Sequence, residues 1–245
     1  MTRYQTFRLK DSNFRIRSDA FAQATAAIRR ERGLLEAYLE RHPEFRTSLV
    51  PVGLLPNAPE IARRMAQAAS RTGVGPMAAV AGTIAQLAAE AALRAGAAEA
   101  IVENGGDLYL ASSQEVLVAL YAGRSPIGST LAFAVPAEQL PLAICSSSSR
   151  MGHSLSLGDC DLATVVATDA SLADAAATLA ANLVRTPADI DSALNTILAI
   201  PGIAGVLLIK DDRIGLAGDL PPLVRNADAA SQRKITRDRR SGPLP

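Results

Sequence analysis

The sequence predicts a protein of mixed α+β or α/β class, because stretches with strand and helix character alternate along its 245 residues. Short runs rich in Val, Ile and Thr, such as residues 162–167, favour extended and buried strands. Alanine-rich stretches, such as residues 76–94, favour helices whose small side chains allow close packing against a sheet or a ligand. A chain of this length can bury a sizeable core, as one unit or as two lobes.

The predicted elements follow one another without an internal repeat or a clear linker. A strand hairpin is expected first, then a helix with an apolar stripe, then two further helices; these cover residues 4–16, 19–41, 59–71 and 76–94. Strands are expected at residues 100–103, 108–110, 115–121, 130–135, 162–167, 205–210 and 213–216, with helices beginning near residue 171 and covering residues 188–198. We expect a single domain over residues 1–225 and a basic, disordered tail over residues 226–245.

Composition excludes several classes of partner. The 25 basic and 24 acidic residues nearly cancel, so no overall field favours nucleic acid or an anionic membrane. Two cysteines, Cys145 and Cys160, suit a reduced protein better than a disulfide scaffold. The first residues alternate polar and apolar side chains without an apolar signal core, which indicates a cytoplasmic location. The apolar residues 74–98 contain polar and charged positions and predict a buried helix, not a membrane span.

The stretch Asn104-Gly105-Gly106-Asp107 lies between two strand-like runs. Asn and Gly tolerate positive φ, so the simplest interpretation is a short turn. The functional alternative is that the glycines let a phosphate or a ring approach the main chain, while Asp107 accepts hydrogen bonds from a sugar or base. It is not a dinucleotide fingerprint, because no G-x-G-x-x-G opens a helix here.

Asp174 also has a structural and a functional interpretation. Ser171 and Asp174 have the spacing of a capping box, in which the serine caps a helix and the acid three residues later returns a hydrogen bond. Thr178 lies one turn further on the same helical face. The Asp174 carboxylate and the Thr178 hydroxyl could therefore be hard oxygen ligands of Mg²⁺, which needs only one or two protein ligands besides water and phosphate.

A hydroxyl-rich loop contains Ser146, Ser147, Ser148 and Ser149 and, a few residues later, His153. No G-x-S-x-G is present, so the loop is not a nucleophile elbow. Either it binds a phosphate through hydroxyl and N–H groups or it is a plain connection. His153 is either a hydrogen-bonded structural residue or a group that contacts substrate and transfers a proton. Cys145 has no base nearby in the sequence, which argues against a reactive thiol.

Taken in order, three motifs resemble the ApbE-like superfamily, and more closely its compact UPF0280 branch. They are Val102-Glu103-Asn104-Gly105-Gly106-Asp107, Cys145-Ser146-Ser147-Ser148-Ser149 with Gly152-His153-Ser154, and Ala173-Asp174-Ala175-Ala176-Ala177-Thr178. The similarity covers most of the chain and leaves out the basic tail.

The resemblance implies an α+β fold with mixed or antiparallel sheets and alanine-rich helices around a central cleft that holds a flavin dinucleotide. ApbE proteins are Mg²⁺-dependent transferases that cleave the pyrophosphate of FAD and attach FMN to a Thr or Ser of an acceptor protein. By position, Asp174 and Thr178 match the metal ligands, and Gly105, Gly106 and Asp107, with Asn104 before them, match the turn beside the flavin. Ser147 and Ser148 match a cofactor-binding loop, and His153 corresponds loosely to a catalytic His.

Two departures from the family pattern leave alternatives open. An I-D-P-x-T-G-x-P segment is replaced by the shorter residues 154–158, and Gly82 stands where the family has an acid. The chain is therefore expected either to act on FAD or a related phosphorylated ligand with Mg²⁺, by FMN transfer or pyrophosphate cleavage, or to bind a flavin or nucleotide without catalysis. A structural protein with a degenerate cleft is a third alternative, and a homodimer is compatible with the apolar edge strands.

Overall fold

The computed structural model describes residues 3–122, 130–148 and 158–226, and its main feature is an eight-stranded sheet. The strand order is β1-β2-β3-β4-β7-β8-β9-β10, and every neighbouring pair is antiparallel. The strands are β1 (Gln5–Leu9), β2 (Ser12–Ser18), β3 (Ala100–Asn104), β4 (Asp107–Ala111), β7 (Leu142–Ser147), β8 (Leu162–Ala167), β9 (Ile203–Lys210) and β10 (Arg213–Gly218). The antiparallel order confirms the α+β class and excludes the α/β alternative, which requires parallel strands.

A second, smaller sheet has the order β11-β6-β5 and is also antiparallel. Its strands are β5 (Val116–Ala119), β6 (Leu131–Val135) and β11 (Leu223–Arg225). Asn226, just after β11, donates a main-chain hydrogen bond to Thr130. The predicted tail lies, apart from Asn226, outside the described residues.

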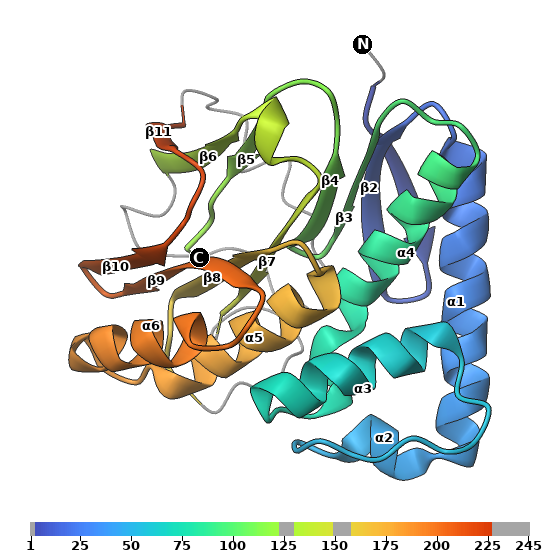
Figure 1. The fold of residues 1–245 in the computed structure, drawn as a ribbon, viewed down its shortest axis with the longest axis horizontal. Helices are drawn as coiled ribbons and strands as arrows, with labels where there is room; N and C mark the ends of the chain where they lie inside the picture. The colour runs from blue at the N-terminus through green and yellow to red at the C-terminus, as the bar shows by residue number, and fades with distance from the viewer. Residues whose placement is uncertain (1–2, 123–129, 149–157, 227–245) are drawn as a thin grey trace.

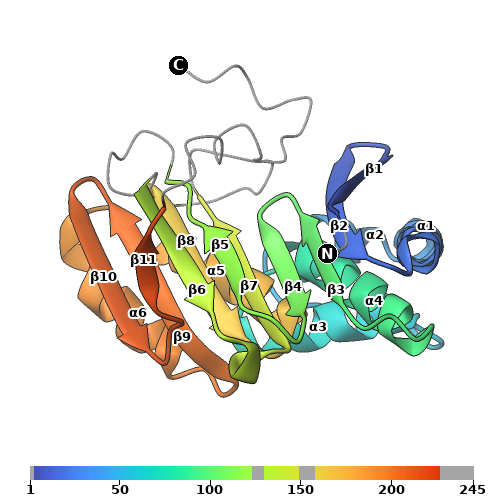
Figure 2. The same cartoon turned by 90° about the horizontal axis from the view of Figure 1, so that it is seen from above.

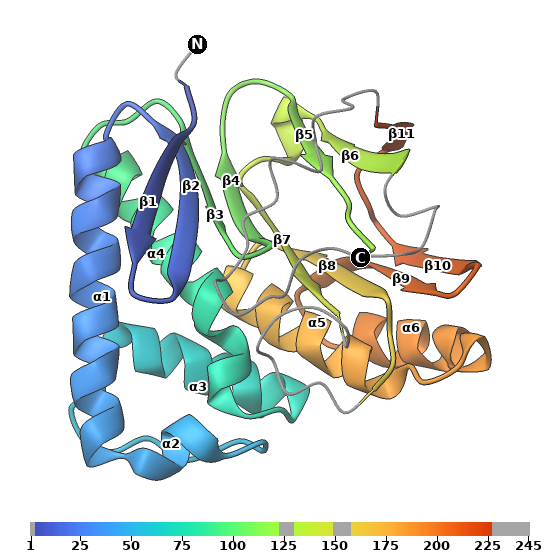
Figure 3. The ribbon, with the colours of Figure 1, turned by 180° about the vertical axis from the view of Figure 1, so that it is seen from behind.

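Helices cover the face of the large sheet that is turned away from the small sheet (Figures 1 and 2). They are α1 (Phe21–Arg41), α2 (Pro43–Thr47), α3 (Glu60–Thr72), α4 (Val80–Arg94), α5 (Ala170–Leu183) and α6 (Ile190–Leu198), with short 3-10 turns at Pro76–Ala79, Ala137–Gln139 and Pro187–Asp189. Figure 3 shows α1 beside the β1–β2 end of the sheet and α6 beneath the β9–β10 end. The helices and strands predicted from the sequence are present with small shifts of their ends, but α2, β7 and β11 were not predicted. Ser146 and Ser147, expected in a loop, lie instead at the end of β7.

Alternation of side chains along each strand separates two apolar layers. On β8, Ala163 and Val165 belong to the layer under the helices, whereas Leu162 and Val166 belong to the layer between the two sheets. Neighbouring side chains on a strand point to opposite faces, so a polar residue's place in the strand decides which layer it enters. This rule places the site residues described below on the helix side.

The sequence predicts His42 as a surface residue that ends a helix before Pro43, and Asn57 as the N-cap of the next helix, and the structure corrects both expectations. His42 ends α1, as its proline neighbour predicts, but it is only 9% exposed, and its Nε2 atom lies 2.9 Å from the carbonyl oxygen of Gly53. Asn57 does not cap α3: the N-cap residue is Pro59, and Asn57 has a left-handed φ of 58°. The main chain therefore turns at Asn57 before the helix begins.

Within the described residues, one helical stretch, Pro76–Arg94, is long and apolar enough to span a membrane by length and composition. Its most apolar window is 56% buried inside the protein. Core helices of soluble proteins pass the same test, and the burial agrees with the prediction of a buried helix.

Candidate functional site

The hairpin between β3 and β4 brings two polar side chains under the helices. Asn104 pairs with Asp107 across a two-residue turn in which Gly105 and Gly106 have φ values of 67° and 108°. The turn interpretation is thus confirmed, because both central positions use a φ that favours glycine. Asn104 and Asp107 are 6% and 7% exposed, and the Asn104 side-chain N–H donates to the carbonyl of Ala81 at 3.2 Å.

Strand β7 lies beside β4 and adds a thiol and a main-chain donor to this hairpin. The main-chain N–H of Ser146 donates to Oδ1 of Asp107 at 3.3 Å, and the Cys145 thiol also hydrogen-bonds the Asp107 carboxyl. Cys145 is fully buried and contacts the carbonyl of Ala170 at the start of α5. Asp107 is therefore fixed from the strand side, with its carboxyl facing the helices.

The predicted capping box of α5 is wrong. The helix begins at Ala170, and its N-cap is Asp169, whose Oδ1 atom accepts hydrogen bonds from the N–H groups of Ser171 and Leu172 at 2.8 and 3.3 Å. Ser171 lies inside the helix, where its hydroxyl accepts a hydrogen bond from the Thr83 hydroxyl at 2.9 Å. The true cap, Asp169, lies two residues before Ser171, the cap that the capping-box pattern predicts. Aspartate is nevertheless one of the residues preferred at the N-cap. Asp174 thus has no role in capping its own helix.

Asp174 instead contacts α4. Its Oδ2 atom accepts a hydrogen bond from the main-chain N–H of Gly82 at 2.8 Å, and Ala81 contributes a second main-chain hydrogen bond to the carboxyl. These donors belong to the first turn of α4, whose N–H groups have no partner within the helix. A Cβ on Gly82 would lie 2.3 Å from the Ala170 carbonyl oxygen and 2.9 Å from the Asp174 Cβ. Glycine is therefore required for this close contact of α4 with α5.

The two acids influence each other electrostatically inside the protein. Burial raises the pKa of Asp107 to about 7, although the Ser146 and Cys145 hydrogen bonds lower it and Glu103 raises it. Burial also raises the pKa of Asp174 well above its usual range, and the charge of Asp107 raises it further. The Cys145 thiol, buried beside both acids, has a pKa well above its usual value and stays neutral. A proton or a cation is needed to neutralise such a carboxyl pair.

The serines at the end of β7 lie on different faces. Ser146 belongs to the intersheet face, where its hydroxyl lies 2.9 Å from the hydroxyl of the buried Thr164. Ser147 lies two residues after Cys145 and so points to the helix side with it. Its hydroxyl is buried and has no hydrogen-bond partner among the residues that the structure describes. Ser148 is 6% exposed, and its polar groups are not free of partners.

The two residues expected to bind a metal lie on the buried face of α5. Asp174 and Thr178, four residues apart on α5, are 9% and 7% exposed. No group of three or more His, Cys, Asp or Glu side chains that could enclose a metal occurs in the described residues. One carboxylate and one hydroxyl, with the Asp107 carboxylate nearby, fit a Mg²⁺ ion that keeps water or phosphate oxygens as its other ligands. His153 lies outside the described residues.

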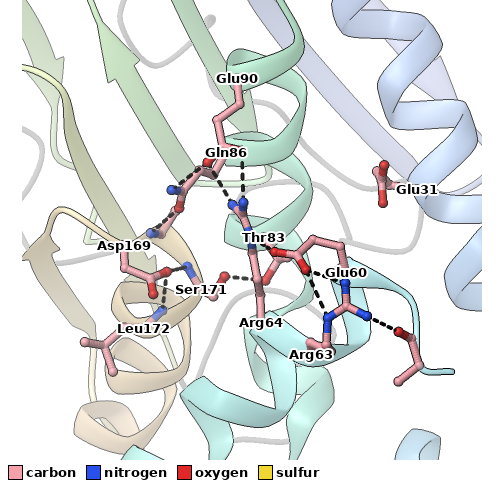
Figure 4. A network of polar contacts seen from close by, with 12 residues as sticks. Glu31, Glu60, Arg63, Arg64, Thr83, Gln86, Glu90, Asp169, Ser171 and Leu172 are labelled. Carbon is pink, nitrogen blue, oxygen red and sulfur yellow. Dashed lines mark hydrogen bonds and ion pairs between the residues drawn. The ribbon is translucent and has the colours of Figure 1, made fainter. Parts of the chain in front are cut away.

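A polar network on α3, α4 and α5 holds the helices that carry the site (Figure 4). Arg64 on α3 forms ion pairs with Glu60 and, at 2.8 Å, with Glu90 on α4. Glu90 accepts a hydrogen bond from Gln86, whose own Oε1 atom accepts one from the N–H of Ala170 at 2.8 Å. The start of α5 is thereby fixed to α4 one turn before Asp174.

Sequence reasoning missed the donors supplied by Ala81 and Gly82 and the thiol supplied by Cys145. The small residues of α4, Gly82 among them, predict close approach of its main chain to a sheet or a ligand, and the contact with α5 agrees with that expectation. The partner of Gly82 could not have been named, because Asp174 lies 92 residues later in the chain. The structure brings together Asn104, Asp107 and Asp174, and it places the hydroxyl of Ser147 on the same side of the sheet.

Comparison with known proteins agrees with the fold. A family model described as "AbpE bacteria" matches residues 4–213. The UPF0280 protein of Methanocella arvoryzae is 43% identical over 198 residues, which cover 81% of this chain and 80% of that protein. The UPF0280 protein of Methanosarcina acetivorans is 40% identical over 223 residues, which cover 89% and 88%.

Solved structures show the same architecture at much lower identity. The apo form of the flavinyl transferase ApbE of Pseudomonas stutzeri superposes with a TM-score of 0.58 at 12% identity, covering 89% of this chain and 94% of that one. The ApbE protein of Thermotoga maritima superposes with a TM-score of 0.53, also at 12% identity, covering 97% and 100%. At this identity the likeness establishes the fold and leaves the chemistry to the residues of this chain.

Proposed function

The chain belongs to the UPF0280 family of ApbE-like proteins, and from this membership we propose that it binds FAD or a related phosphorylated dinucleotide together with Mg²⁺. The observation that carries the proposal is the buried pair Asp107 and Asp174 on the helix side of the sheet. The solved structures are described as flavin transferases, and at 12% identity that activity is proposed for this chain on the basis of its own residues.

The charge of the site supports a cation requirement. The charged groups that act on the two acids are themselves acids: Glu103 on Asp107, and Asp107 on Asp174. At a pH where these acids are ionised, a pyrophosphate brought to the pair without a cation would face carboxylates of its own sign. We therefore expect an anionic ligand to bind only with a divalent cation that neutralises both sides.

Individual residues have distinct proposed roles. Asp174 and Thr178 would hold Mg²⁺, with the N–H groups of Ala81 and Gly82 fixing the Asp174 carboxyl. When bound, the ion would neutralise pyrophosphate charge and polarise a phosphoryl oxygen. The Ser147 hydroxyl, buried without a partner, would donate to the ligand, and the Gly105–Gly106 turn would let the ligand approach the main chain.

The proposed reaction is transfer of FMN to a Thr or Ser hydroxyl of an acceptor protein. The hydroxyl oxygen would form a bond to the FMN phosphorus while the P–O–P bond of FAD breaks and AMP leaves. The hydroxyl proton needs an acceptor, for which His153 is the proposed group. Both acids come from one chain, so this activity does not depend on the homodimer that the sequence suggests. A cytoplasmic location stays a prediction.

Binding without catalysis is the second candidate, and Gly82 favours it. The Gly82 position has no room for a side chain, so the acid that the family pattern places there cannot be supplied at that point of α4. Hydrolysis to FMN and AMP, or binding alone, would then remain.

Calorimetric titration with FAD, with and without Mg²⁺, tests the proposal on the wild-type protein and on two variants. Asp174→Asn keeps an oxygen that accepts from Gly82 but removes the negative charge, so we expect Mg²⁺-dependent binding to be lost. Asp191→Asn changes an exposed acid on α6 and should bind as the wild type does. Binding of equal strength without Mg²⁺, or in Asp174→Asn, would contradict the metal role. Attachment of FMN to the acceptor protein identifies transfer, release of AMP without attachment identifies hydrolysis, and neither occurs in binding alone.

A further inference from the structure

Strand β10 leaves one edge of the eight-stranded sheet open. In the described part of the chain β10 pairs only with β9, from Arg213 opposite Lys210 to Gly218 opposite Gly205. The two strands are joined by the two-residue turn Asp211–Asp212. In such a hairpin the residues that flank the turn form a hydrogen-bonded pair, and such pairs recur at every second residue. Residues 213, 215 and 217 therefore bind β9, whereas the N–H and C=O groups of residues 214, 216 and 218 point outward.

The side chains of this edge lack the usual protection against pairing. Between Arg213 and Asp219 the chain reads Ile214, Gly215, Leu216, Ala217, Gly218, without a charge or a proline. Leu216 is 49% exposed at its centre. The opposite edge strand, β1, carries the exposed Arg8 and ends next to Lys10. Charged edges prevent strand addition, and open apolar edges allow it.

We infer that β10 is the interface of a homodimer, in which two copies pair their β10 strands antiparallel about a two-fold axis at Leu216. This register places Leu216 opposite Leu216 of the second copy and Ile214 opposite Gly218. Each of these positions has its main-chain groups directed outward, so the pairing satisfies them in both copies. It also brings Arg213 near Asp219 of the other copy at both ends. Arg213 pairs with Asp191 of its own chain at 2.7 Å, so Asp219 of the other copy would add a second acid to that pair.

The neighbouring register fits less well. With the axis at Gly215, Asp211 of one copy would approach Asp219 of the other, and like charges would meet at both ends of the pair. The charge pattern therefore favours the axis at Leu216.

The proposed pairing leaves enough space for the two α6 helices, one from each copy. A Cβ on Gly215 would lie 2.3 Å from the Ile190 side chain, so α6 packs directly on the main chain of β10. Figure 1 shows α6 beneath β9 and β10. With strands about 4.8 Å apart, a helix centred between β9 and β10 would lie roughly 9 to 10 Å from its copy across the axis. Packed helices are about 8 to 10 Å apart, so the two α6 helices would make contact without overlap.

Sedimentation or light scattering of the full chain measures the oligomeric state. We expect a dimer for the wild type, a monomer for Leu216→Lys, and a dimer for the control Leu117→Lys, which changes a leucine on β5 that is 65% exposed. A monomeric wild type, or a dimer that persists in Leu216→Lys, would overturn the inference. Circular dichroism of Leu216→Lys checks that the monomer is folded.

Cross-linking tests the register. Cα atoms of a hydrogen-bonded antiparallel pair lie about 5.5 Å apart, within the range of a disulfide. Leu216→Cys should therefore form a covalent dimer on oxidation, while Ile214→Cys, displaced along the strand from its own copy, should not. Cys145 and Cys160 are fully buried, so they do not compete. Cross-linking of Ile214→Cys, or a dimer in which Leu216→Cys fails to cross-link, would show that another register or surface pairs.

Discussion

The carboxyl of Asp174 accepts a hydrogen bond from the main-chain N–H of Gly82, 92 residues earlier, at 2.8 Å. One acid thus satisfies donors of the first turn of α4 and belongs to the candidate site at the same time. The contact exists because Gly82 has no side chain, since a Cβ there would lie 2.3 Å from the Ala170 carbonyl oxygen.

Gly82→Ala should destabilise the protein. The methyl group has to displace the main chain of α5, and insertion of this kind costs about 1–3 kcal/mol, to which a weakened Asp174 hydrogen bond adds. Gly33→Ala is the matched control, because Gly33 lies inside α1 with nothing within 4 Å of the added carbon. The control should gain up to about 1 kcal/mol from higher helix propensity. Urea unfolding of both variants measures the difference, and equal stability of the two would contradict the packing argument.

Asp107→Asn should change how stability depends on pH. The folded-state pKa of Asp107 is about 7, above its ordinary value of 3.8. Between about pH 4 and pH 7 Asp107 is therefore protonated in the folded chain but ionised in the unfolded chain. The free energy of unfolding of the wild type therefore falls as pH rises through this window. The variant should show a flatter profile and greater stability at pH 8, by at most roughly 4 kcal/mol.

Thermal unfolding from pH 4 to pH 8 measures this effect, with Asp11→Asn in the exposed β1–β2 turn as control. The slope should not vanish in Asp107→Asn, because the pKa of Asp174 is raised as well. A control profile as flat as that of Asp107→Asn would show that the effect does not come from the buried site.

Asp169→Ala should cost about 1 kcal/mol, because two N–H groups at the start of α5 lose their acceptor. Asp169→Ser keeps a capping oxygen and should recover most of that loss. Chemical denaturation of the two variants measures the difference. If Asp169→Ala unfolded at the same urea concentration as the wild type, Asp169 would not be the cap of α5.

Most of the helices and strands could be predicted from the sequence because their signals are local, whereas the choice between the α+β and α/β classes needed the family resemblance. Asn104 to Asp107 forms a turn since two adjacent glycines supply positive φ, and residues 162–167 form a strand since their side chains suit burial on both faces. Helix α1 keeps Ile28, Leu35 and Leu39 on one buried stripe, as its spacing predicts. Each of these features depends on residues a few positions apart.

The contacts of the site could not be predicted, because they join residues far apart in the chain. Asp174 had a local explanation in the capping box, and only the packing of α4 on α5 shows that Asp169 does the capping while Asp174 faces Gly82. Burial of Asp107 together with Asp174 likewise depends on the order of β4, β7 and the helices above them. Local signals gave no reason to place Asp107 and Asp174 in one site. The family resemblance did, because it matches Asp107 to the turn beside the flavin and Asp174 to a metal ligand.

Ser147→Ala separates a ligand-binding hydroxyl from a structural one. Within the described parts of the chain the buried Ser147 hydroxyl has no hydrogen-bond partner, so its removal should change the free energy of unfolding by less than about 0.5 kcal/mol. Ser146→Ala is the matched control on the other face of β7. It leaves the fully buried Thr164 hydroxyl without its partner and should cost about 1–2 kcal/mol.

The two serine variants should behave in the opposite way toward ligand. Ser147 lies on the same side of the sheet as Asp107, so Ser147→Ala should weaken FAD binding in the presence of Mg²⁺, by roughly 1 kcal/mol or about fivefold for one lost hydrogen bond. Ser146 faces the intersheet layer, so Ser146→Ala should leave the affinity unchanged at temperatures where it is folded. Calorimetry with FAD measures both. Unchanged affinity in Ser147→Ala would place the ligand elsewhere, and the buried hydroxyl would then lack a function in binding.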